Sequence, residues 1–250
     1  GEPLSANLVI GADGIHSTIR KQMLGDDAPR YTGNTAWRLV VPTDRLDRPP
    51  PPTACVWAGR NRHAVTYLLR GGKLANFVGV VEQAEPVTES WSATGTKAEA
   101  LADFAGWDVT ITELINKSDS HFRWALYDRP ALPKWSDGRV TLLGDACHPM
   151  LPFQAQGAAM AIEDGWALAD ALVGADRIEA GLASYEARRR PRTSKMQHAS
   201  RKNMGVFHRN TAVSQAATFG PMWLAGQMMP GFVRSRLDWI YGYDVTKSDR

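Results

Sequence analysis

The chain has 250 residues, of which 44% are hydrophobic and 22% charged, and its formal net charge is +3. This length and composition are typical of a globular protein with one large domain or two small ones. Two cysteines are too few for a disulfide framework or a cysteine-based metal site, which favours a reducing cytoplasm. No apolar run approaches the ~18 residues that a membrane span needs, so we expect no membrane partner.

The first predicted element lies in residues 7–20, with the sequence Asn-Leu-Val-Ile-Gly-Ala-Asp-Gly-Ile-His-Ser-Thr-Ile-Arg. This pattern predicts a short apolar strand, a Gly-Ala-Asp-Gly turn and a helix. Ser17 is the expected N-cap, and Arg20 follows one turn into the helix.

Strands are predicted next, because β-branched and aromatic residues alternate between turn signals. The expected strands are Ala36–Val41, Thr53–Trp57, His63–Arg70 and Lys73–Val81. The last two are expected to be joined by a two-residue Gly71-Gly72 hairpin. Two short helices follow at Lys97–Phe104 and Val109–Ile115, the second with Asp108 as its cap, and then a return strand at Phe122–Leu126.

Helices dominate the last part of the chain. Strand Arg139–Leu143 leads to a helix at Gly157–Val173 and to a long helix at Ile178–Arg209, which we expect Pro191 to interrupt. The basic run Arg188–Arg192 on the long helix has no interleaved aromatic residues, so we interpret it as a solvated face and expect no nucleic-acid partner. The tail Thr218–Asp244 is predicted to be less regular.

The loop after the strand Val140–Leu143 carries the most informative chemistry. Gly144 allows close approach of the backbone, and Asp145 offers a carboxylate to sugar-like hydroxyls. The Gln156–Ala159 turn presents free backbone N–H groups to an electron-rich partner. This combination favours a site for a polyhydroxylated cofactor; the alternative is an ordinary strand–loop–helix with a surface Asp.

Two motifs in this order, Gly-Ala-Asp-Gly-x-x-Ser-x-x-Arg at residues 11–20 and Gly-Asp-Ala-x-His-Pro at residues 144–149, resemble the flavin-dependent aromatic hydroxylases. These are the group A monooxygenases related to para-hydroxybenzoate hydroxylase. The resemblance implies a mixed α/β (α+β) fold: a Rossmann-like FAD-binding layer, interrupted by an antiparallel substrate-binding sheet, with a long C-terminal helix. The implied domains are the FAD-binding ranges 1–30 and 131–200, the substrate-binding sheet 31–130 and a C-terminal helical tail 201–250.

The same resemblance implies which residues bind FAD. Asp145 would hold the ribityl chain, and Asp13 and Arg20 would organise the nucleotide side. The full implied set is Asp13, Gly14, Arg20, Gly144, Asp145, Pro149, Gln156, Gly157, Ala158 and Ala159. The Gly-x-Gly-x-x-Gly that seats the ADP part of FAD in this family does not occur in the sequence. We therefore interpret the chain as the C-terminal part of a longer hydroxylase, with its own N-terminal FAD-binding segment as a further partner.

His63 and Tyr67 share one face of their predicted strand, since strand side chains alternate between faces. From this spacing alone, the favoured interpretation is a half-buried sheet face on which the two side chains satisfy each other. The motif Arg-His-x-Val-x-Tyr followed by Leu-Arg-Gly-Gly also resembles salicylate hydroxylase, 3-hydroxybenzoate 6-hydroxylase and 6-hydroxynicotinate 3-monooxygenase. That resemblance implies that both side chains line the substrate pocket and assist deprotonation of a phenol.

His148 is the third candidate catalytic residue. Pro149 favours an extended backbone at His148, from which we expect the imidazole to project out of the loop. By resemblance it would meet the substrate; the alternative is a loop His that caps a nearby carbonyl. Cys147 is given no nucleophilic role, and Arg38 is interpreted as a sheet-surface residue outside the site.

The implied reaction is that of an FAD-dependent monooxygenase. NADH or NADPH reduces FAD, O₂ adds at the flavin C4a carbon, and the hydroperoxide hydroxylates a hydroxylated aromatic or N-heteroaromatic acid. Two alternatives stay open: a flavin oxidoreductase acting on a non-phenolic substrate, and a truncated non-catalytic fragment that binds a partner chain or an aromatic ligand. The tail, which is rich in Trp and Met, also allows a homodimer.

Overall fold

A computed structural model of the chain describes residues 2, 4–87 and 92–247. The chain divides into two compact units. The first contains residues up to Arg30, Asp128–Met204 and the chain from Thr218 onward, and the second contains Tyr31–Tyr127 and Gly205–Ala217. The functions that the sequence assigns to these parts stay predictions, and the two units are described separately below.

The first unit is built on a small sheet with the strand order β1-β8-β7. β1 (Val9–Gly11) pairs in parallel with β8 (Val140–Leu142), and β7 (Ser136–Asp137) is antiparallel to β8. A Cβ at Gly11 would lie 2.8 Å from Leu142 and 2.9 Å from Ile19, so only glycine fits where β1 meets its neighbours. Because β1 and β8 are parallel, the two motif loops leave the same edge of the sheet.

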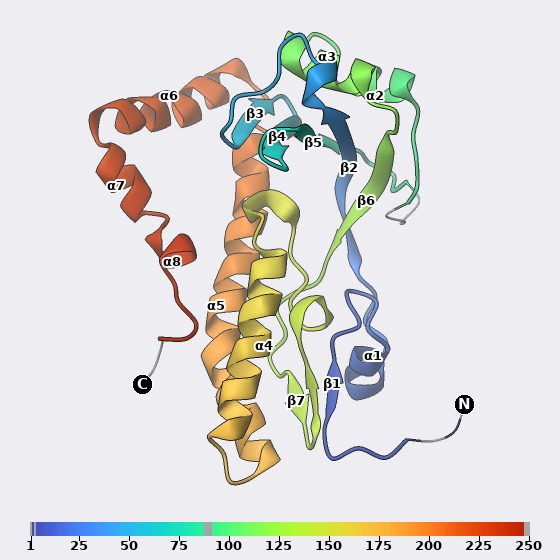
Figure 1. Ribbon diagram of the computed structural model, residues 1–250, viewed down its shortest axis with the longest axis vertical. Helices are drawn as coiled ribbons and strands as arrows, with labels where there is room; N and C mark the ends of the chain where they lie inside the picture. Colours follow the sequence, from blue (N-terminus) through green and yellow to red (C-terminus); the bar gives the residue numbers. More distant parts are fainter. Residues whose placement is uncertain (1, 3, 88–91, 248–250) are drawn as a thin grey trace. The chain divides into compact units, whose positions relative to one another are not determined.

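Helices α1, α4 and most of α5 belong to this unit, with α7 and α8 of the tail (Figure 1). α1 (Thr18–Leu24) is capped by Ser17, whose Oγ accepts a hydrogen bond from the N–H of Arg20 at 2.9 Å. α4 (Gly157–Val173) lies beside α5 (Ile178–Phe207). Buried side chains from the sheet, the loop after β8 and both long helices form the core, among them Trp135, Leu142, Cys147, Leu168 and Tyr185. The helix predicted at Gly157–Val173 and its bounds are confirmed.

α5 is continuous through Pro191, so the expected interruption is wrong. Arg189 and Arg192, on either side of the proline, both form ion pairs with Glu163 of α4, at 2.7 and 2.8 Å. These pairs hold α5 against α4 where the proline removes one backbone hydrogen bond. The interpretation of the basic run as a solvated face is also wrong, since Arg189 is fully buried.

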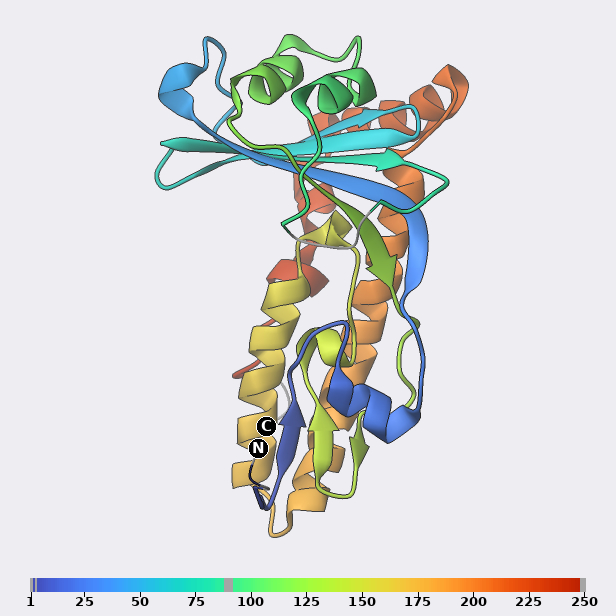
Figure 2. The same ribbon diagram turned by 90° about the vertical axis from the view of Figure 1, so that its right-hand side faces the viewer.

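The second unit is a five-stranded sheet with the order β3-β4-β5-β2-β6. Its strands are β2 (Arg30–Pro42), β3 (Cys55–Gly59), β4 (Arg62–Leu69), β5 (Leu74–Glu82) and β6 (Phe122–Asp128). α2 (Lys97–Asp103) and α3 (Val109–Lys117) cover one face of the sheet (Figure 2). Trp37, Leu39, Phe77, Phe104 and Ile111 belong to the core between them. The other face of the sheet carries the candidate substrate residues.

Two local details differ from expectation. The turn between β4 and β5 takes four residues, Arg70–Lys73, because Arg70 (φ +51°) joins both glycines in the left-handed region. The range Thr218–Asp244 is more regular than its composition indicates and agrees with the helical tail that the resemblance implies, with α6 (Ala212–Met228), α7 (Pro230–Ser235) and α8 (Asp238–Tyr241). Pro230 stands in the first turn of α7, where a missing N–H costs nothing, so it starts a helix there.

Short 3₁₀ turns occur at Thr43–Arg45 (η1), Gly144–Ala146 (η2) and Pro152–Gln154 (η3). Among the described residues, no helix combines the length and apolarity that crossing a membrane requires.

Candidate functional site

A cavity of about 520 Å³ opens in the first unit, where the loops after β1 and β8 meet the start of α4. Its lining is mostly small or apolar: Ala12, Gly14, Leu143, Gly144, Asp145, Met150, Leu151, Pro152, Ala155, Gly157, Ala158 and Ala161. The volume is in the range of small-molecule and cofactor sites. The cavity brings together Gly14, Gly144, Asp145, Gly157 and Ala158 from the predicted set.

The backbone of this cavity depends on unusual conformations. Gly144 has φ +63°, and a Cβ there would lie 3.1 Å from the Cβ of Ala161. Gln156, the N-cap of α4, forms no capping hydrogen bond through its side chain within the described part of the chain. The N–H groups of the first turn of α4, Gly157–Ala159, are therefore available to an electron-rich ligand.

Asp145 is the acidic residue of the cavity lining. Desolvation by the surrounding loop raises the pKa of its carboxyl, and the charge of His148 acts in the opposite direction. A carboxylate at this position can accept hydrogen bonds from the hydroxyls of a ligand.

Asp13 and Arg20 lie outside this lining. The Oδ2 of Asp13 accepts hydrogen bonds from the N–H groups of Thr18 at 2.7 Å and of Ile19 at 3.3 Å, so it caps α1. Arg20 is 1% exposed and donates to Asp27 and, at 3.2 Å, to the carbonyl oxygen of Ala146. Arg20 thus holds η2 through the carbonyl of Ala146, and its part in organising the nucleotide side stays a prediction.

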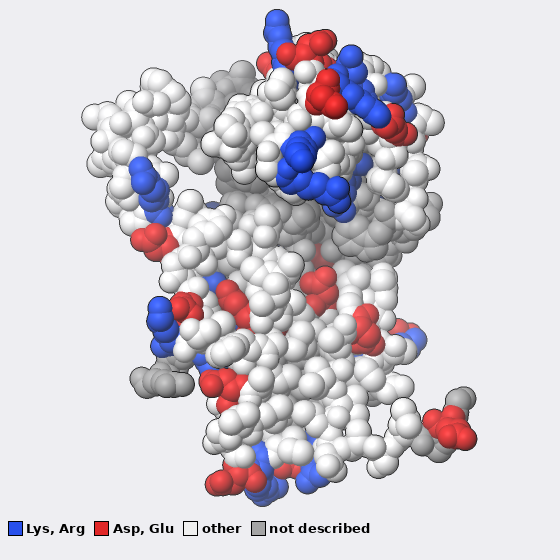
Figure 3. All heavy atoms as spheres, viewed as in Figure 1, with Lys and Arg blue, Asp and Glu red and all other residues white. Residues whose placement is uncertain are grey.

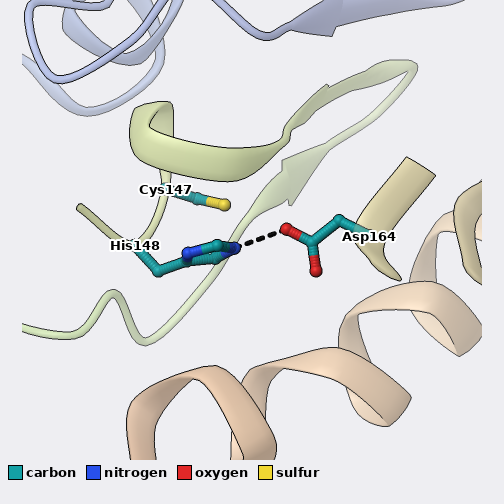
Figure 4. A group of neighbouring side chains, drawn as sticks. All are labelled: Cys147, His148 and Asp164. Carbon is teal, nitrogen blue, oxygen red and sulfur yellow. Dashed lines mark hydrogen bonds and ion pairs between the residues drawn. The ribbon is translucent and has the colours of Figure 1, made fainter. Parts of the chain in front are cut away.

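The imidazole of His148 projects from its loop toward Asp164 of α4, where it is buried, and its predicted meeting with a substrate stays a prediction (Figure 4). Its ring is 1% exposed, and Nε2 contacts Oδ2 of Asp164 on α4. Oδ1 of Asp164 accepts from Nε of Arg189 at 2.8 Å, and Oδ2 also accepts from the N–H of Gly144 at 3.2 Å. Pro149 restricts only the backbone of His148, whereas this buried carboxylate decides where the ring points.

Cys147, His148 and Asp164 lie close enough together to suggest a metal site, with ligand atoms within 4.8 Å of one another (Figure 4). Burial and the charge of Asp164 raise the pKa of the Cys147 thiol well above its ordinary value, so the sulfur stays protonated. Burial opposes ionisation of Asp164, but the hydrogen bonds and charges of His148 and Arg189 outweigh it and lower its pKa. His148 and Arg189 therefore share the buried Asp164 carboxylate in one structural network.

The second unit presents His63, Val65 and Tyr67 on one face of β4, while Ala64 and Thr66 face the core under the helices. His63 is 1% exposed, and its Nδ1 lies 2.7 Å from Nε2 of His208. Burial, with the charge of His208, lowers the pKa of His63 to about 3. His63 is therefore a neutral imidazole near pH 7, and Tyr67 is half-buried on the same face.

That neutral state predicts how stability depends on pH. An unfolded chain binds a proton at His63 near pH 6.5, and the folded chain does so only near pH 3. Stability is therefore lost as the pH falls below 6.5, by up to about 1.4 kcal/mol per pH unit from this group. Urea unfolding between pH 7.5 and 4.5 should show this slope, and His63→Gln should flatten it; an unchanged slope in the variant would contradict the assignment.

Strand register adds two residues that the sequence did not assign to the site. Tyr67 pairs with Asn76, which pairs with Val40, and Val65 pairs with Val78, which pairs with Arg38. Arg38 therefore shares the Tyr67 face and lines a cavity of about 280 Å³ with Val40, Ser120, Phe122 and Trp124. Asn76 is fully buried, and its side-chain Oδ1 and Nδ2 have no hydrogen-bond partner among the described residues. Alternation within β2 places Arg38 on a face, but only the long-range pairing shows which face that is.

Comparison with known proteins shows a consistent relationship. A family model described as "FAD binding domain" matches residues 1–200. The chain is 40% identical to 3-amino-4-hydroxybenzoate 2-monooxygenase of Streptomyces platensis, covering 98% of this chain and 61% of the relative. It is 40% identical to 6-hydroxynicotinate 3-monooxygenase of Pseudomonas fluorescens, covering 98% and 58%. The solved substrate complex of salicylate hydroxylase superposes with a TM-score of 0.81 at 29% identity, covering 98% of this chain and 64% of that one. The chain thus spans about three fifths of the length of these relatives.

Proposed function

Because this chain belongs to the FAD-binding domain family, we propose that it forms part of an FAD-dependent monooxygenase that hydroxylates a hydroxylated aromatic or N-heteroaromatic acid. NADH or NADPH is the reductant and O₂ the co-substrate. The observation that carries the proposal is that His63 and Tyr67 share one face of β4. A reducing cytoplasm suits both the nicotinamide donor and two free cysteines.

The first unit fits FAD. A cavity of about 520 Å³ with a small-residue lining, Asp145 at its wall and the uncapped start of α4 match a flavin with its ribityl chain. Gly14, Gly144, Asp145, Gly157, Ala158 and Ala159 would hold it, with Pro149 and Gln156 shaping the loop. Bound FAD would supply the oxygen activation that side chains cannot. The ADP part would be held by a segment outside residues 1–250, since the chain has no Gly-x-Gly-x-x-Gly.

The second unit supplies the groups that act on the substrate. His63 and Tyr67 are four residues apart on β4, or ~13 Å between Cα atoms, with Val65 between them on the same face, so a single aromatic ring that lies over Val65 is within reach of both side chains. His63 takes the proton of the ring hydroxyl and Tyr67 hydrogen-bonds the resulting oxyanion, which raises the electron density of the ring. Arg38 pairs with the carboxylate of the acid, and the amide of Asn76 binds a polar ring substituent.

His148 is reassigned by this proposal from catalysis to positioning. Its contact with Asp164 joins the Gly144–Pro149 loop to α4, while Arg189 joins Asp164 to α5. These two contacts thereby fix the Gly144–Pro149 loop, which lines the FAD cavity, to α4 and α5.

The proposed function is tested on the full-length gene product that contains this chain. We expect a yellow protein with bound flavin that oxidises NADH or NADPH faster when salicylate, 3-hydroxybenzoate or 6-hydroxynicotinate is added, with a hydroxylated product by mass spectrometry. A full-length protein that binds no flavin, or that shows no stimulation by any hydroxylated aromatic acid, would contradict it.

Asp145→Ala should weaken FAD binding about 10- to 100-fold, because a hydrogen bond to a charged acceptor contributes roughly 1.5–3 kcal/mol. Fluorescence titration of the deflavinated full-length protein with FAD measures this change. Asp137→Ala is the matched control, since Asp137 pairs with Lys134 at the surface, away from the cavity. Equal affinities of the two variants would remove Asp145 from the site.

We further propose that the tail forms a homodimer contact. α6 has no charged residue and is white in Figure 3, and exposed apolar side chains continue into α7: Met222, Trp223, Leu224, Met228, Met229 and Phe232. Such a surface favours association. Light scattering after size exclusion should give a dimer mass that Trp223→Glu converts to a monomer mass, and a monomeric parent protein would refute the contact.

A further inference from the structure

The end of the tail is anchored to the first unit around Arg192 of α5. The guanidinium of Arg192 donates to the carbonyl oxygens of Trp239, at 2.6 Å, and of Ile240, at 3.2 Å. Its Cζ lies 3.8 Å over the centre of the Tyr243 ring, and Ile240 itself is buried. The helices α6 and α7, which precede this segment, contain no buried residue. Residues 238–245, which return to the side of α5 after this exposed part of the tail, are termed the strap (Figure 1).

The same guanidinium also binds α4. Its Nε and Nη2 donate to the two carboxylate oxygens of Glu163, at 2.8 and 2.9 Å, so the pair is bidentate. The Arg192 side chain is 10% exposed, and the contacts are therefore largely shielded from water. The carbonyl groups of the last turn of a short helix such as α8 have no partner within that helix, and a cation beside them is stabilising. Arg192 thus links α4, α5 and the strap.

Methionine side chains connect the strap with the wall of the FAD cavity. Ile240 belongs to one buried cluster with Met160 of α4 and Met196 of α5, and Met150 packs against that cluster. Met150 also lines the cavity. The N–H of Met160 donates to the carbonyl oxygen of Gln156 at 2.9 Å, so Met160 closes the first turn of α4. Because a packed interior transmits displacements, a shift of Ile240 alters both the cavity wall and this turn.

We propose that Arg192 is a positioning residue for the cofactor, and that it acts by holding the strap against the Met150–Met160 side of the FAD cavity. This inference rests on the proposed function. Neither Arg192 nor a residue of the strap belongs to the described cavity lining, so the effect passes through the methionine cluster. Docking of the strap and binding of FAD are then linked equilibria, and each stabilises the other by the same factor.

The first test removes the link in the full-length protein. Arg192→Gln and Ile240→Ser should each weaken FAD binding about 10-fold, measured by fluorescence titration of the deflavinated protein. Ile240→Ser leaves the pairing of α5 with Glu163 in place. Arg236→Gln is the matched control, since Arg236 belongs to the same tail but is exposed and lies over Phe232. Unchanged FAD affinity of Ile240→Ser would overturn the proposal, because any effect of Arg192→Gln would then come from Glu163 alone.

The second test uses the unmodified full-length protein and so does not depend on the folding of a variant. FAD should slow hydrogen exchange at the amides of Ile240, Tyr241 and Gly242, which bond to carbonyl oxygens at the start of α8, by about 10-fold. The amide of Val233 in α7, bonded to the carbonyl oxygen of Met229, is the control and should exchange equally with and without FAD. A purely structural strap would show no such dependence on FAD.

The outcomes separate this inference from the proposed function. Exchange at the strap amides that is the same with and without FAD, in a protein that binds FAD, would overturn the link and leave the proposed function intact. A full-length protein that binds no flavin would contradict the proposed function and this inference with it.

Discussion

Replacing His63 by Gln is expected to lower kcat for the hydroxylated aromatic acid about 10²- to 10⁴-fold, because an amide cannot take up the proton of the ring hydroxyl. His63 is buried, and burial lowers its pKa, so in the native protein the imidazole is neutral near pH 7. Steady-state oxidation of NAD(P)H, together with product formation, measures the effect in the full-length protein.

The matched control is His121→Gln. His121 is also a buried histidine of the second unit, but its Nε2 is bonded to the carbonyl oxygen of Ile115 at 2.9 Å, beneath the helices. We expect it to lower stability and leave kcat within a few-fold. If the two variants lose activity equally, and in proportion to their melting temperatures, His63 is not the base.

Asp164→Ala is expected to lower the free energy of unfolding by about 3–5 kcal/mol, since it removes the fully buried one of the two carboxylates that pair with the buried Arg189 guanidinium. Arg189 and Asp164 are both fully buried, and their Nε–Oδ1 distance is 2.8 Å. His148 loses its contact with Asp164 in the same variant, so the Gly144–Pro149 loop should also become more mobile. Urea denaturation and limited proteolysis measure the two effects.

Asp170→Ala is the control that separates the effect of burial on stability from the effect of losing a charge. Asp170 is also on α4 and pairs with Arg188 of α5 at 3.0 Å, but its side chain is 52% exposed. Such a pair contributes about 0–1 kcal/mol, so this variant should unfold close to the parent protein. If the free energy of unfolding of Asp164→Ala also lies within about 1 kcal/mol of that of the parent protein, the buried network is not a determinant of stability.

Local signals predicted much of the fold. Ser17 and Asp108 cap the helices that follow them, and the helix Gly157–Val173 has the bounds that its small-residue start and Gly174 indicate. These features depend on hydrogen bonds within a few residues, which a single sequence displays. The family resemblance supplied the cofactor, because two motifs with fixed spacing are carried by the sequence itself.

The errors concern side chains whose partners are distant in the sequence. Nothing near His148 announces Asp164, and nothing near Arg189 announces that two acidic residues of the preceding helix will enclose it. His208 and Arg38 were passed over for the same reason. His208 is notable only for its hydrogen bonds with His63 and Glu82, which are far away in the sequence. The sheet face on which Arg38 lies follows from the pairing of β2 with β5.

The parallel pairing of β1 with β8 has a consequence for synthesis on the ribosome. Gly11 cannot meet Leu142 until nearly all of the second unit's sheet has been made, so Val9–Gly11 must wait unpaired. Two of the four pairings of the antiparallel sheet, β3 with β4 and β4 with β5, join strands that are neighbours in sequence, and such local pairing forms early. Once the sheet forms, the hydroxyl of Thr32 donates a hydrogen bond to the carbonyl oxygen of Leu126 at 2.9 Å. This contact shortens the loop that must still close between β1 and β8 to a little more than a quarter of its length. That lowers the entropic cost of joining β1 to β8 by about 1 kcal/mol. Formation of the antiparallel sheet therefore favours the pairing of β1 with β8 as the chain leaves the ribosome.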